Sequence, residues 1–300
     1  MTDPQTTADT GGKPRSLASD AWHDLRRRPL FLISTALIAV LLVLAAFPQL
    51  FTSVDPSAGV LSRSRRSPSA EAWFGYDIFG RDVYARTIYG TRVSILVGVL
   101  ATTFTVLVGG TMGILAGYYG GWLDNLLSRV ADVFFGLPFV LGAIVVLSTF
   151  RETVGDSPVR ITALVVLTMS ALSWPVAMRI MRSAAIAARQ QDYVRAARGL
   201  GAGPGRVIWR HMLPNCLAPV LVYATIVLGA FIGAEATLSF LGIGLRDPVV
   251  SWGVMISEAR NYVRVSPHLL LFPAGFLAVT VLAFVMLGDA VREAFDPKSR

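Results

Sequence analysis

The sequence predicts an all-α polytopic membrane protein with about six transmembrane helices. Two observations lead to this prediction. Of the 300 residues, 54% are hydrophobic and only 15% are charged, with a mean hydropathy of +0.58, whereas soluble domains carry about 25% charged residues. The chain also contains six apolar runs of about 20 residues or more, and at about 1.5 Å per residue a helix of that length crosses a hydrocarbon layer of about 30 Å.

The chain opens with a polar segment that leads into the first apolar run. Residues 1–20 are rich in Thr, Asp, Gly, Pro and Ser, a composition typical of disorder, and we expect 1–29 to be a cytoplasmic tail. Three arginines at 26–28 precede the first transmembrane helix, which is expected at 30–50. The mixed, turn-forming residues 51–90 then form a predicted extracytoplasmic loop.

Residues 91–292 contain the other five apolar runs and are expected to form one membrane domain, followed by a cytoplasmic tail at 293–300. The runs lie at 93–118, 130–150, 161–181, 217–241 and 269–291. Six spans place both termini on the same side of the membrane. Lys and Arg favour the cytoplasmic side, so the arginine-rich loop 182–216 and both termini are predicted to be cytoplasmic.

One region conflicts with this charge rule. Six arginines fall on the predicted outside, namely Arg63, Arg65, Arg66, Arg81, Arg86 and Arg92. The rule is weaker for longer segments that fold as a unit. Asp77 and Asp82 lie close to Arg81 and Arg86 in sequence, and we expect them to offset part of the positive charge.

The loop 182–216 has the pattern of two short helices joined by a turn. Tyr193, Ala196, Ala197 and Leu200 are spaced i, i+3, i+4 and i+7, which predicts an apolar stripe on a short helix. Asp192 is a candidate N-cap. Gly199, Gly201 and Gly203 suit the end of that helix and a reversal, and Pro204 suits the first turn of the next. Either a protein partner or lipid headgroups fit such a surface.

Several other functions are excluded by the residues present. The Gly-rich run at 199–205 follows no strand and precedes no Gly-Lys-Ser/Thr, so it does not predict phosphate binding. The single Cys216 excludes an intrachain disulfide and a cysteine-built metal site. No nucleophile–base or metal-ligand spacing predicts an enzyme. Basic residues that flank spans account for the net charge of +8, so no nucleic-acid partner is expected.

The loop resembles the cytoplasmic coupling loop of ABC importer permeases. Their pattern is Glu-Ala-Ala, three residues, Gly, then an apolar residue and Leu-Pro; this chain has Arg195-Ala196-Ala197, Gly199 and Leu213-Pro214. The usual glutamate is therefore Arg195 here. The spacing is that of the peptide branch, where Asp-Tyr-Val-X-Ala-Ala-Arg-X-Leu-Gly is usual. Further segments are similar to the C-type subunit of dipeptide and oligopeptide permeases: 74–77, 80–82, 90–94, 235–242, 251–253 and 288–297.

This resemblance implies a type I ABC importer transmembrane-domain fold in a bacterial inner membrane. It implies a non-enzymatic permease subunit without cofactor, which forms half of a pathway for di- or oligopeptides; nickel complexes or haem remain alternatives. The implied partners are a homologous second permease, two ABC ATPase subunits and an extracytoplasmic solute-binding protein. The residues implied in ATPase coupling are Asp192, Tyr193, Ala196, Ala197, Gly199, Leu200 and Gly201. A secondary transporter is a further alternative, but no clear internal repeat supports it.

Polar and small residues inside the apolar runs raise further expectations. A carboxylate within a span is costly and faces either a pathway or a polar partner, so Glu235 is a candidate for pathway lining or for helix packing. Arg129 and Asp132, three residues apart, predict a local ion pair. The glycines at 109, 110, 113 and 117 predict a face for close helix packing.

Overall fold

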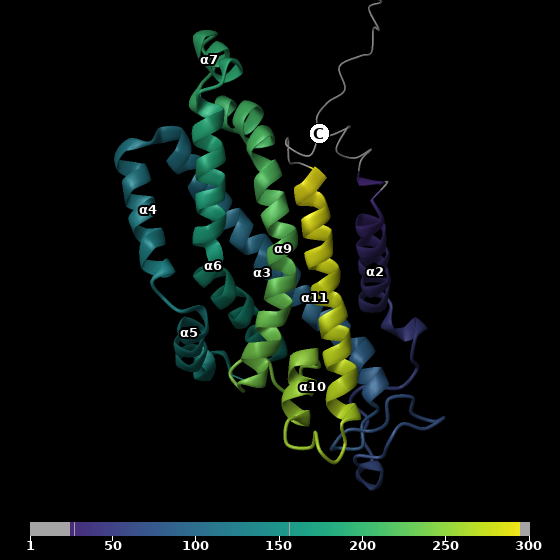
Figure 1. Cartoon of the computed structure of the whole chain (residues 1–300). Coiled ribbons are helices and arrows are strands. Elements are labelled where there is room, and N and C mark those ends of the chain that lie inside the picture. Colours follow the sequence, from purple (N-terminus) through teal and green to yellow (C-terminus); the bar gives the residue numbers. More distant parts are fainter. Residues whose placement is uncertain (1–24, 27, 156, 295–300) are drawn as a thin grey trace, which may run out of the picture.

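The computed structural model describes residues 25–26, 28–155 and 157–294. The expected disorder at 1–20 and most of the expected carboxy-terminal tail lie outside this part. The described residues form helices and two isolated β-bridges, with no strand among them. The long helices run side by side (Figure 1). The prediction of an all-helical fold is therefore confirmed.

Five helical segments are long and apolar enough to cross a membrane. They are α2 (Pro29–Ala46), α3 (Val83–Tyr119), α6 (Pro158–Arg189), the continuous segment Pro204–Phe240 that ends in α9 (Leu213–Phe240), and α11 (His268–Ala294). The helices α4 (Gly121–Phe135) and α5 (Phe139–Val154) are long and apolar enough for a sixth crossing only if they are taken together, and they are bent by 88° relative to each other, the geometry of a broken span or a re-entrant loop. The described residues therefore hold five or six candidate spans, in agreement with the expectation of about six.

The third span differs from the prediction of one helix at 130–150. The helix is broken inside that range, between Phe135 and Phe139. Pro138 stands immediately before α5, and a proline inside a helix removes a hydrogen bond and clashes with the preceding turn. Gly136 closes α4. The apolar run is therefore continuous in sequence while the backbone changes direction within it.

Two other boundaries also shift. The first helix ends at Ala46 rather than at residue 50, and Phe47 and a short turn at Pro48–Leu50 follow it. Helix α3 begins ten residues earlier than expected, because Asp82 accepts a hydrogen bond from the backbone N–H of Ala85 at 2.9 Å and caps it. The connection between them is thus residues 47–82, and we name it the connecting segment.

Helices α3 and α6 cross at a face of glycines, as the sequence predicts. A Cβ atom on Gly109 would lie 2.4 Å from the carbonyl oxygen of Trp174, and one on Gly113 would lie 2.4 Å from that of Met178. Gly117 is packed as closely against Ala185. The two backbones approach so closely that no side chain fits between them, which is the usual role of small residues in membrane helices.

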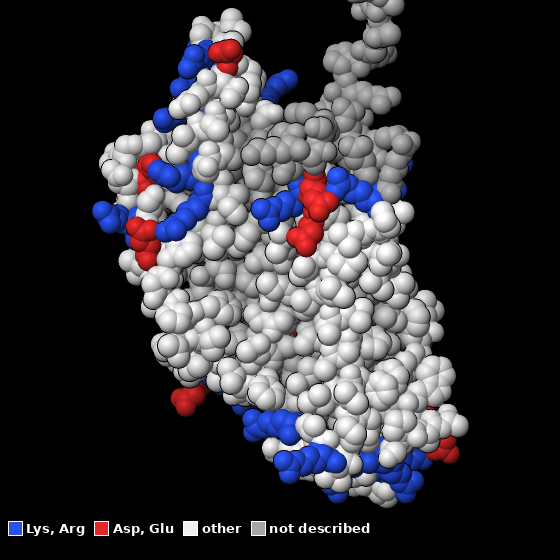
Figure 2. Space-filling model, in the orientation of Figure 1, with Lys and Arg blue, Asp and Glu red and all other residues white. Residues whose placement is uncertain are grey.

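The molecule has two charged ends separated by an uncharged band (Figure 2). At one end lie α7 (Asp192–Gly199), the start of α2 and the end of α11, where Arg28 pairs with Glu293 (Figure 1). At the other end lie the connecting segment and the short helix α10 (Trp252–Ala259). This distribution is that of a protein whose middle lies in hydrocarbon.

Candidate functional site

The segment between α6 and α9 forms a compact tip at one end of the bundle. Helix α6 continues to Arg189, so the irregular part is shorter than the predicted loop 182–216. Helix α7 follows, and Gly201 turns the chain with a φ of +82°, a conformation that favours glycine. Pro204 opens α8 (Pro204–Arg206) as predicted, and a π-helical turn (Val207–Met212) leads into α9. Figure 1 shows α7 at the upper extremity of the molecule.

The start of α7 differs from the prediction. Asp192 is the first residue of the helix, and Gln191 occupies the N-cap position without a side-chain hydrogen bond. The Asp192 carboxylate instead lies in the first turn, where its negative charge interacts favourably with the positive end of the helix dipole. It also lies 3.9 Å from the guanidinium of Arg195, and both side chains are exposed. Such an exposed pair contributes little to stability.

The predicted apolar stripe of α7 is divided between two faces. Ala197 is buried against the chain itself, as is Val194, which the stripe did not include. Tyr193, Ala196 and Leu200 are exposed, and Leu200 is 89% exposed. The inner face fixes α7 on the bundle, and the outer face presents apolar surface to the surroundings.

The glycines of the tip leave its outer face open. A Cβ on Gly199 or Gly201 would meet nothing within 4 Å. The base of the tip is firmer, because Arg198 lies over the ring of Tyr118, 4.8 Å from its centroid. The Tyr118 carbonyl also accepts a hydrogen bond from Arg189 at 3.1 Å. The tip is thus an anchored platform with an unoccupied outer surface.

Helix α4 is attached to α6 near this tip by two ion pairs. Asp124 pairs with Arg182, with 2.7 Å between Oδ2 and Nη2. Asp132 pairs with Arg179 at 2.7 Å. The expected local pair between Arg129 and Asp132 is therefore wrong, because the carboxylate reaches a different helix.

Glu235 lies fully buried in α9, near the opposite end of the bundle from α7. Its Oε1 accepts hydrogen bonds from the hydroxyls of Ser239 at 2.8 Å and Ser251 at 3.0 Å, and Oε2 has no partner among the described residues. Ser251 in turn caps α10 by accepting from the N–H of Val254. Glu235 therefore joins α9 to the first turn of α10.

Trp252, the next residue, continues this attachment to a third helix. Its backbone N–H donates to Ser94 at 3.2 Å and its indole N–H donates to the carbonyl of Thr87 at 3.0 Å, both in α3. The side chain is completely buried. These contacts favour the packing alternative for Glu235 over pathway lining.

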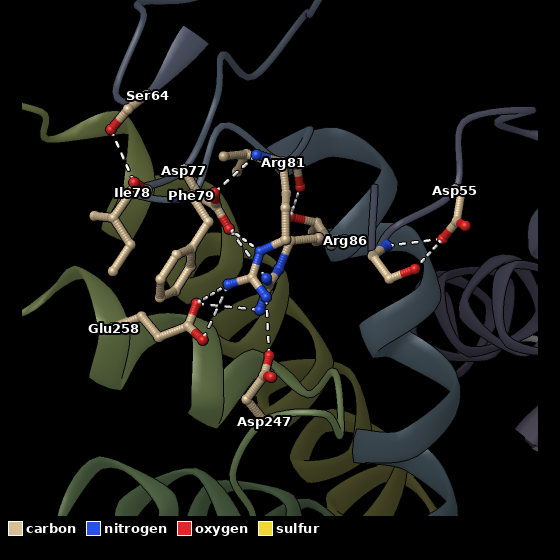
Figure 3. Close-up of polar contacts among 12 residues, drawn as sticks. Asp55, Ser64, Asp77, Ile78, Phe79, Arg81, Arg86, Asp247 and Glu258 are labelled. Atoms are coloured by element: carbon tan, nitrogen blue, oxygen red, sulfur yellow. Dashed lines mark hydrogen bonds and ion pairs between the residues drawn. The ribbon is translucent and has the colours of Figure 1, made fainter. Parts of the chain in front are cut away.

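A second polar cluster, buried except for the exposed side chain of Asp247, lies beside α10 and resolves part of the arginine conflict (Figure 3). Arg81 bonds Asp77 at 2.6 Å, Asp247 at 2.8 Å and Glu258 at 3.1 Å. Arg86 bonds Asp77 at 3.0 Å and Glu258 at 3.1 Å. We call these five residues the charge clasp.

The clasp includes acids that sequence proximity does not identify. Asp77 was expected near the arginines, but Asp82 caps α3 and forms no ion pair with either of them. Asp247 and Glu258 come from more than 150 residues further along the chain. Only the fold shows that they neutralise Arg81 and Arg86.

The fold and its anchored tip define a polytopic helical membrane protein of the transporter-permease class. Residues 109–300 match the model of the binding-protein-dependent transport system inner membrane component, and residues 16–68 match the N-terminal TM domain of oligopeptide transport permease C. The first match covers more than half of the chain. The chain therefore belongs to the family of binding-protein-dependent transport system inner membrane components.

Relatives cover nearly the whole sequence. The dipeptide transport system permease protein DppC of Alkalihalophilus pseudofirmus is 36% identical, over 94% of this chain and 90% of the relative. The oligopeptide transport system permease protein OppC of Bacillus subtilis is 33% identical over 96% and 92%. The glutathione transport system permease protein GsiD of Pectobacterium atrosepticum is 33% identical over 92% and 90%.

Solved structures share the fold. The MetNI methionine ABC transporter in an inward-facing conformation contains a chain that matches with a TM-score of 0.56 and 19% identity, covering 70% of this chain and 96% of that one. An amino acid ABC transporter matches with a TM-score of 0.51 and 16% identity, over 68% and 91%. The fold is that of type I ABC importer permeases, as the sequence predicts.

Proposed function

We propose that this chain is the permease subunit of an ATP-driven importer of di- or oligopeptides and forms half of the translocation pathway. The proposed substrate class is based on the relatives of this chain. They are dipeptide, oligopeptide and glutathione permeases at 33–36% identity over more than nine-tenths of this chain. Glutathione is itself a tripeptide, so all three substrates share a peptide backbone. ATP hydrolysis belongs to partner subunits in this proposal.

The proposal requires partners on both faces of the membrane. A homologous second permease completes the pathway, two ABC ATPases bind the end that carries α7, and a solute-binding protein delivers peptide at the opposite end. Both termini and α7 are then cytoplasmic, because ATP is available only there. The connecting segment and α10 are extracytoplasmic.

The outer face of α7 is the surface that supports ATPase docking. Tyr193, Ala196 and Leu200 present apolar area at the extremity of the molecule. Asp192, Gly199 and Gly201 lie on the same exposed tip. In this proposal Ala197 does not contact the ATPase. It is buried and holds α7 on the bundle.

A matched pair of leucine substitutions tests this docking. Leu200, the residue that ends α7, is 89% exposed, and Leu61 is 74% exposed in the connecting segment at the opposite end. Loss of a buried leucine from an interface costs about 1.5–3 kcal/mol, which is about 10- to 150-fold in affinity. We expect Leu200→Asp to abolish co-purification of the ATPases while the permease still inserts, and Leu61→Asp to retain them. Full ATPase retention by Leu200→Asp would refute docking on this face.

A further inference from the structure

An open apolar groove with a volume of about 520 Å³ lies between α3 and the start of α6, and residues 248–250 before α10 form its third side. Along α3 the groove extends from Val93 to Phe104, and along α6 it extends from Pro158 to Leu167. At about 1.5 Å per helical residue, the stretch of α3 is about 17 Å long. One leaflet supplies about half of a hydrocarbon layer of about 30 Å, so the groove has the length of a single leaflet.

The lining of this groove is almost entirely hydrocarbon. Among the described residues that line it, Thr162 alone has a polar side chain, and its hydroxyl donates to the carbonyl of Pro158 in the same helix at 2.8 Å. Leu96, Val159 and Leu167 are exposed, so the groove is open to its surroundings. The lining offers a peptide no side chain with an unused donor or acceptor, whereas a hydrocarbon chain loses no hydrogen bond by entering it.

Two arginines stand at the end of the groove that lies toward α10. Arg92 immediately precedes Val93 and lies one turn before Leu96 on α3. Side chains of a helix point toward its N-terminus, so the guanidinium of Arg92 extends beyond the groove toward the charged end of the molecule. Arg160 lies in the first turn of α6, next to Val159. Both arginines are exposed, and neither forms a hydrogen bond or an ion pair with another described residue.

Positive charge is in excess among the segments that meet at this end of the groove. They carry the arginines Arg92, Arg151, Arg160 and Arg246 and the acids Glu152, Asp156 and Asp247. Asp247 pairs with Arg81 in the charge clasp. Glu152 is exposed on α5, and Asp156 lies outside the described residues. Four arginines therefore remain against two acids, and such an excess attracts an anion.

We propose that the groove binds an anionic phospholipid, whose acyl chain lies between α3 and α6 and whose phosphate lies at Arg92 and Arg160. A guanidinium binds a phosphate through two parallel hydrogen bonds, and the groove beside the two arginines has the length and the chemistry of one acyl chain. This inference rests on the proposed function only for the side of the membrane, which is then the extracytoplasmic leaflet.

The extent of the groove favours a lipid over a helix of a second permease. A transmembrane helix would need an apolar groove across the whole hydrocarbon layer. This groove ends at Phe104, before α3 meets the backbone of α6 at Gly109. It therefore accommodates a chain that enters from one face of the membrane and stops near its middle.

Lipid binding to the full chain in detergent tests the proposed headgroup contacts. The probes are phosphatidylglycerol, which is anionic, and phosphatidylcholine with the same acyl chains, and native mass spectrometry counts the bound molecules of each. We expect the wild type to prefer phosphatidylglycerol. Each arginine near an anionic lipid contributes about fivefold in affinity, so Arg92→Gln combined with Arg160→Gln should weaken phosphatidylglycerol binding about 25-fold and leave phosphatidylcholine binding unchanged.

Arg260→Gln combined with Arg264→Gln is the matched control. Both of these arginines are exposed in or after the last turn of α10 and neither lines the groove, so this variant loses the same charge at the same end of the molecule. It should keep the wild-type preference for phosphatidylglycerol. An equal loss in the two double variants would show attraction by net charge alone and overturn the site, as would equal binding of the two lipids to the wild type.

A second pair of variants tests the acyl-chain part of the site. Ala163 is an exposed residue of the groove, so Ala163→Trp fills the groove without entering the core and should abolish the preference for phosphatidylglycerol. Gly275→Trp is the control, because Gly275 lines a separate apolar groove between α2 and α11 and its Cβ would meet nothing within 4 Å. Unchanged phosphatidylglycerol binding by Ala163→Trp would overturn the proposal.

The occupant of the groove in the assembled importer is identified by photo-crosslinking. A benzophenone maleimide is attached to Leu96→Cys in a Cys216→Ser background, and Leu96 lies in the groove. We expect crosslinks to phospholipid, and crosslinks to the second permease instead would overturn the proposal by showing that the groove is a subunit interface. If the chain assembles with no partner and transports no peptide, the proposed function fails, while lipid binding to the chain alone still decides the lipid site.

Discussion

Replacement of Glu235 separates a packing role from a pathway role. Glu235→Leu removes the only oxygen that accepts from the hydroxyls of Ser239 and Ser251. Each hydroxyl is then left buried without an acceptor, at about 1–3 kcal/mol apiece, so the expected destabilisation is about 2–6 kcal/mol. Glu235→Gln keeps an oxygen of the same geometry and should cost about 1 kcal/mol or less.

The assay is thermal unfolding of the assembled complex together with peptide uptake. We expect Glu235→Gln to assemble and transport, and Glu235→Leu to assemble poorly because α10 loses its attachment to α9. Glu152→Leu is the control, since Glu152 is exposed on α5, and it should change stability by no more than about 0.5 kcal/mol. Loss of uptake by Glu235→Gln in a normally assembled complex would refute the packing role and assign the carboxylate to the pathway.

Two further predictions concern helix packing and orientation. Gly113→Leu should destabilise the chain by about 3 kcal/mol or more in thermal unfolding, because its Cβ would lie 2.4 Å from a backbone carbonyl of α6. Gly110→Ala is the control and should be neutral, because the nearest contact of its added Cβ is 3.6 Å away. Equal effects of the two substitutions would contradict the packing of α3 on α6. Single cysteines at Ser57 and Gln190, in a Cys216→Ser background, should be labelled by a membrane-impermeant thiol reagent on intact cells at 57 but not at 190, and the reverse pattern would invert the orientation.

The sequence was sufficient to predict the helical fold, because apolar runs of about 20 residues indicate membrane-spanning helices and Lys and Arg between them indicate the cytoplasmic side. It was also sufficient for the glycine face on α3, since helical spacing alone brings those residues together. The prediction of one helix at 130–150 was wrong, because the apolar run continues through a change of backbone direction. The Gly136-Leu137-Pro138 triplet breaks the third span there, and its glycine and proline were the residues in the sequence that could have indicated the break.

Long-range polar contacts were the other failure. Arg129 is the nearest base to Asp132 in sequence, but Arg179 of another helix is its partner in the fold. Likewise, nothing near Arg81 in sequence indicates Glu258, because 177 residues separate them. Helical periodicity shows which residues share a face, whereas pairing between elements depends on how the elements pack.

The burial of Ala197 shows a related limit for the candidate site. Helical spacing placed it on one stripe with Ala196 and Leu200, yet α7 contacts the bundle along Val194 and Ala197. A periodic pattern does not tell which part of an apolar stripe faces the chain itself. The coupling role of the exposed residues remains a prediction.

Reconstitution into proteoliposomes tests the central claim most directly. The vesicles would contain this chain, a homologous second permease and the two ATPases, with the solute-binding protein and a labelled dipeptide added outside and ATP enclosed within. We predict accumulation of the dipeptide that requires ATP, the binding protein and this chain together. Uptake by this chain alone, driven by an ion gradient and indifferent to ATP, would contradict the assignment and indicate a secondary transporter.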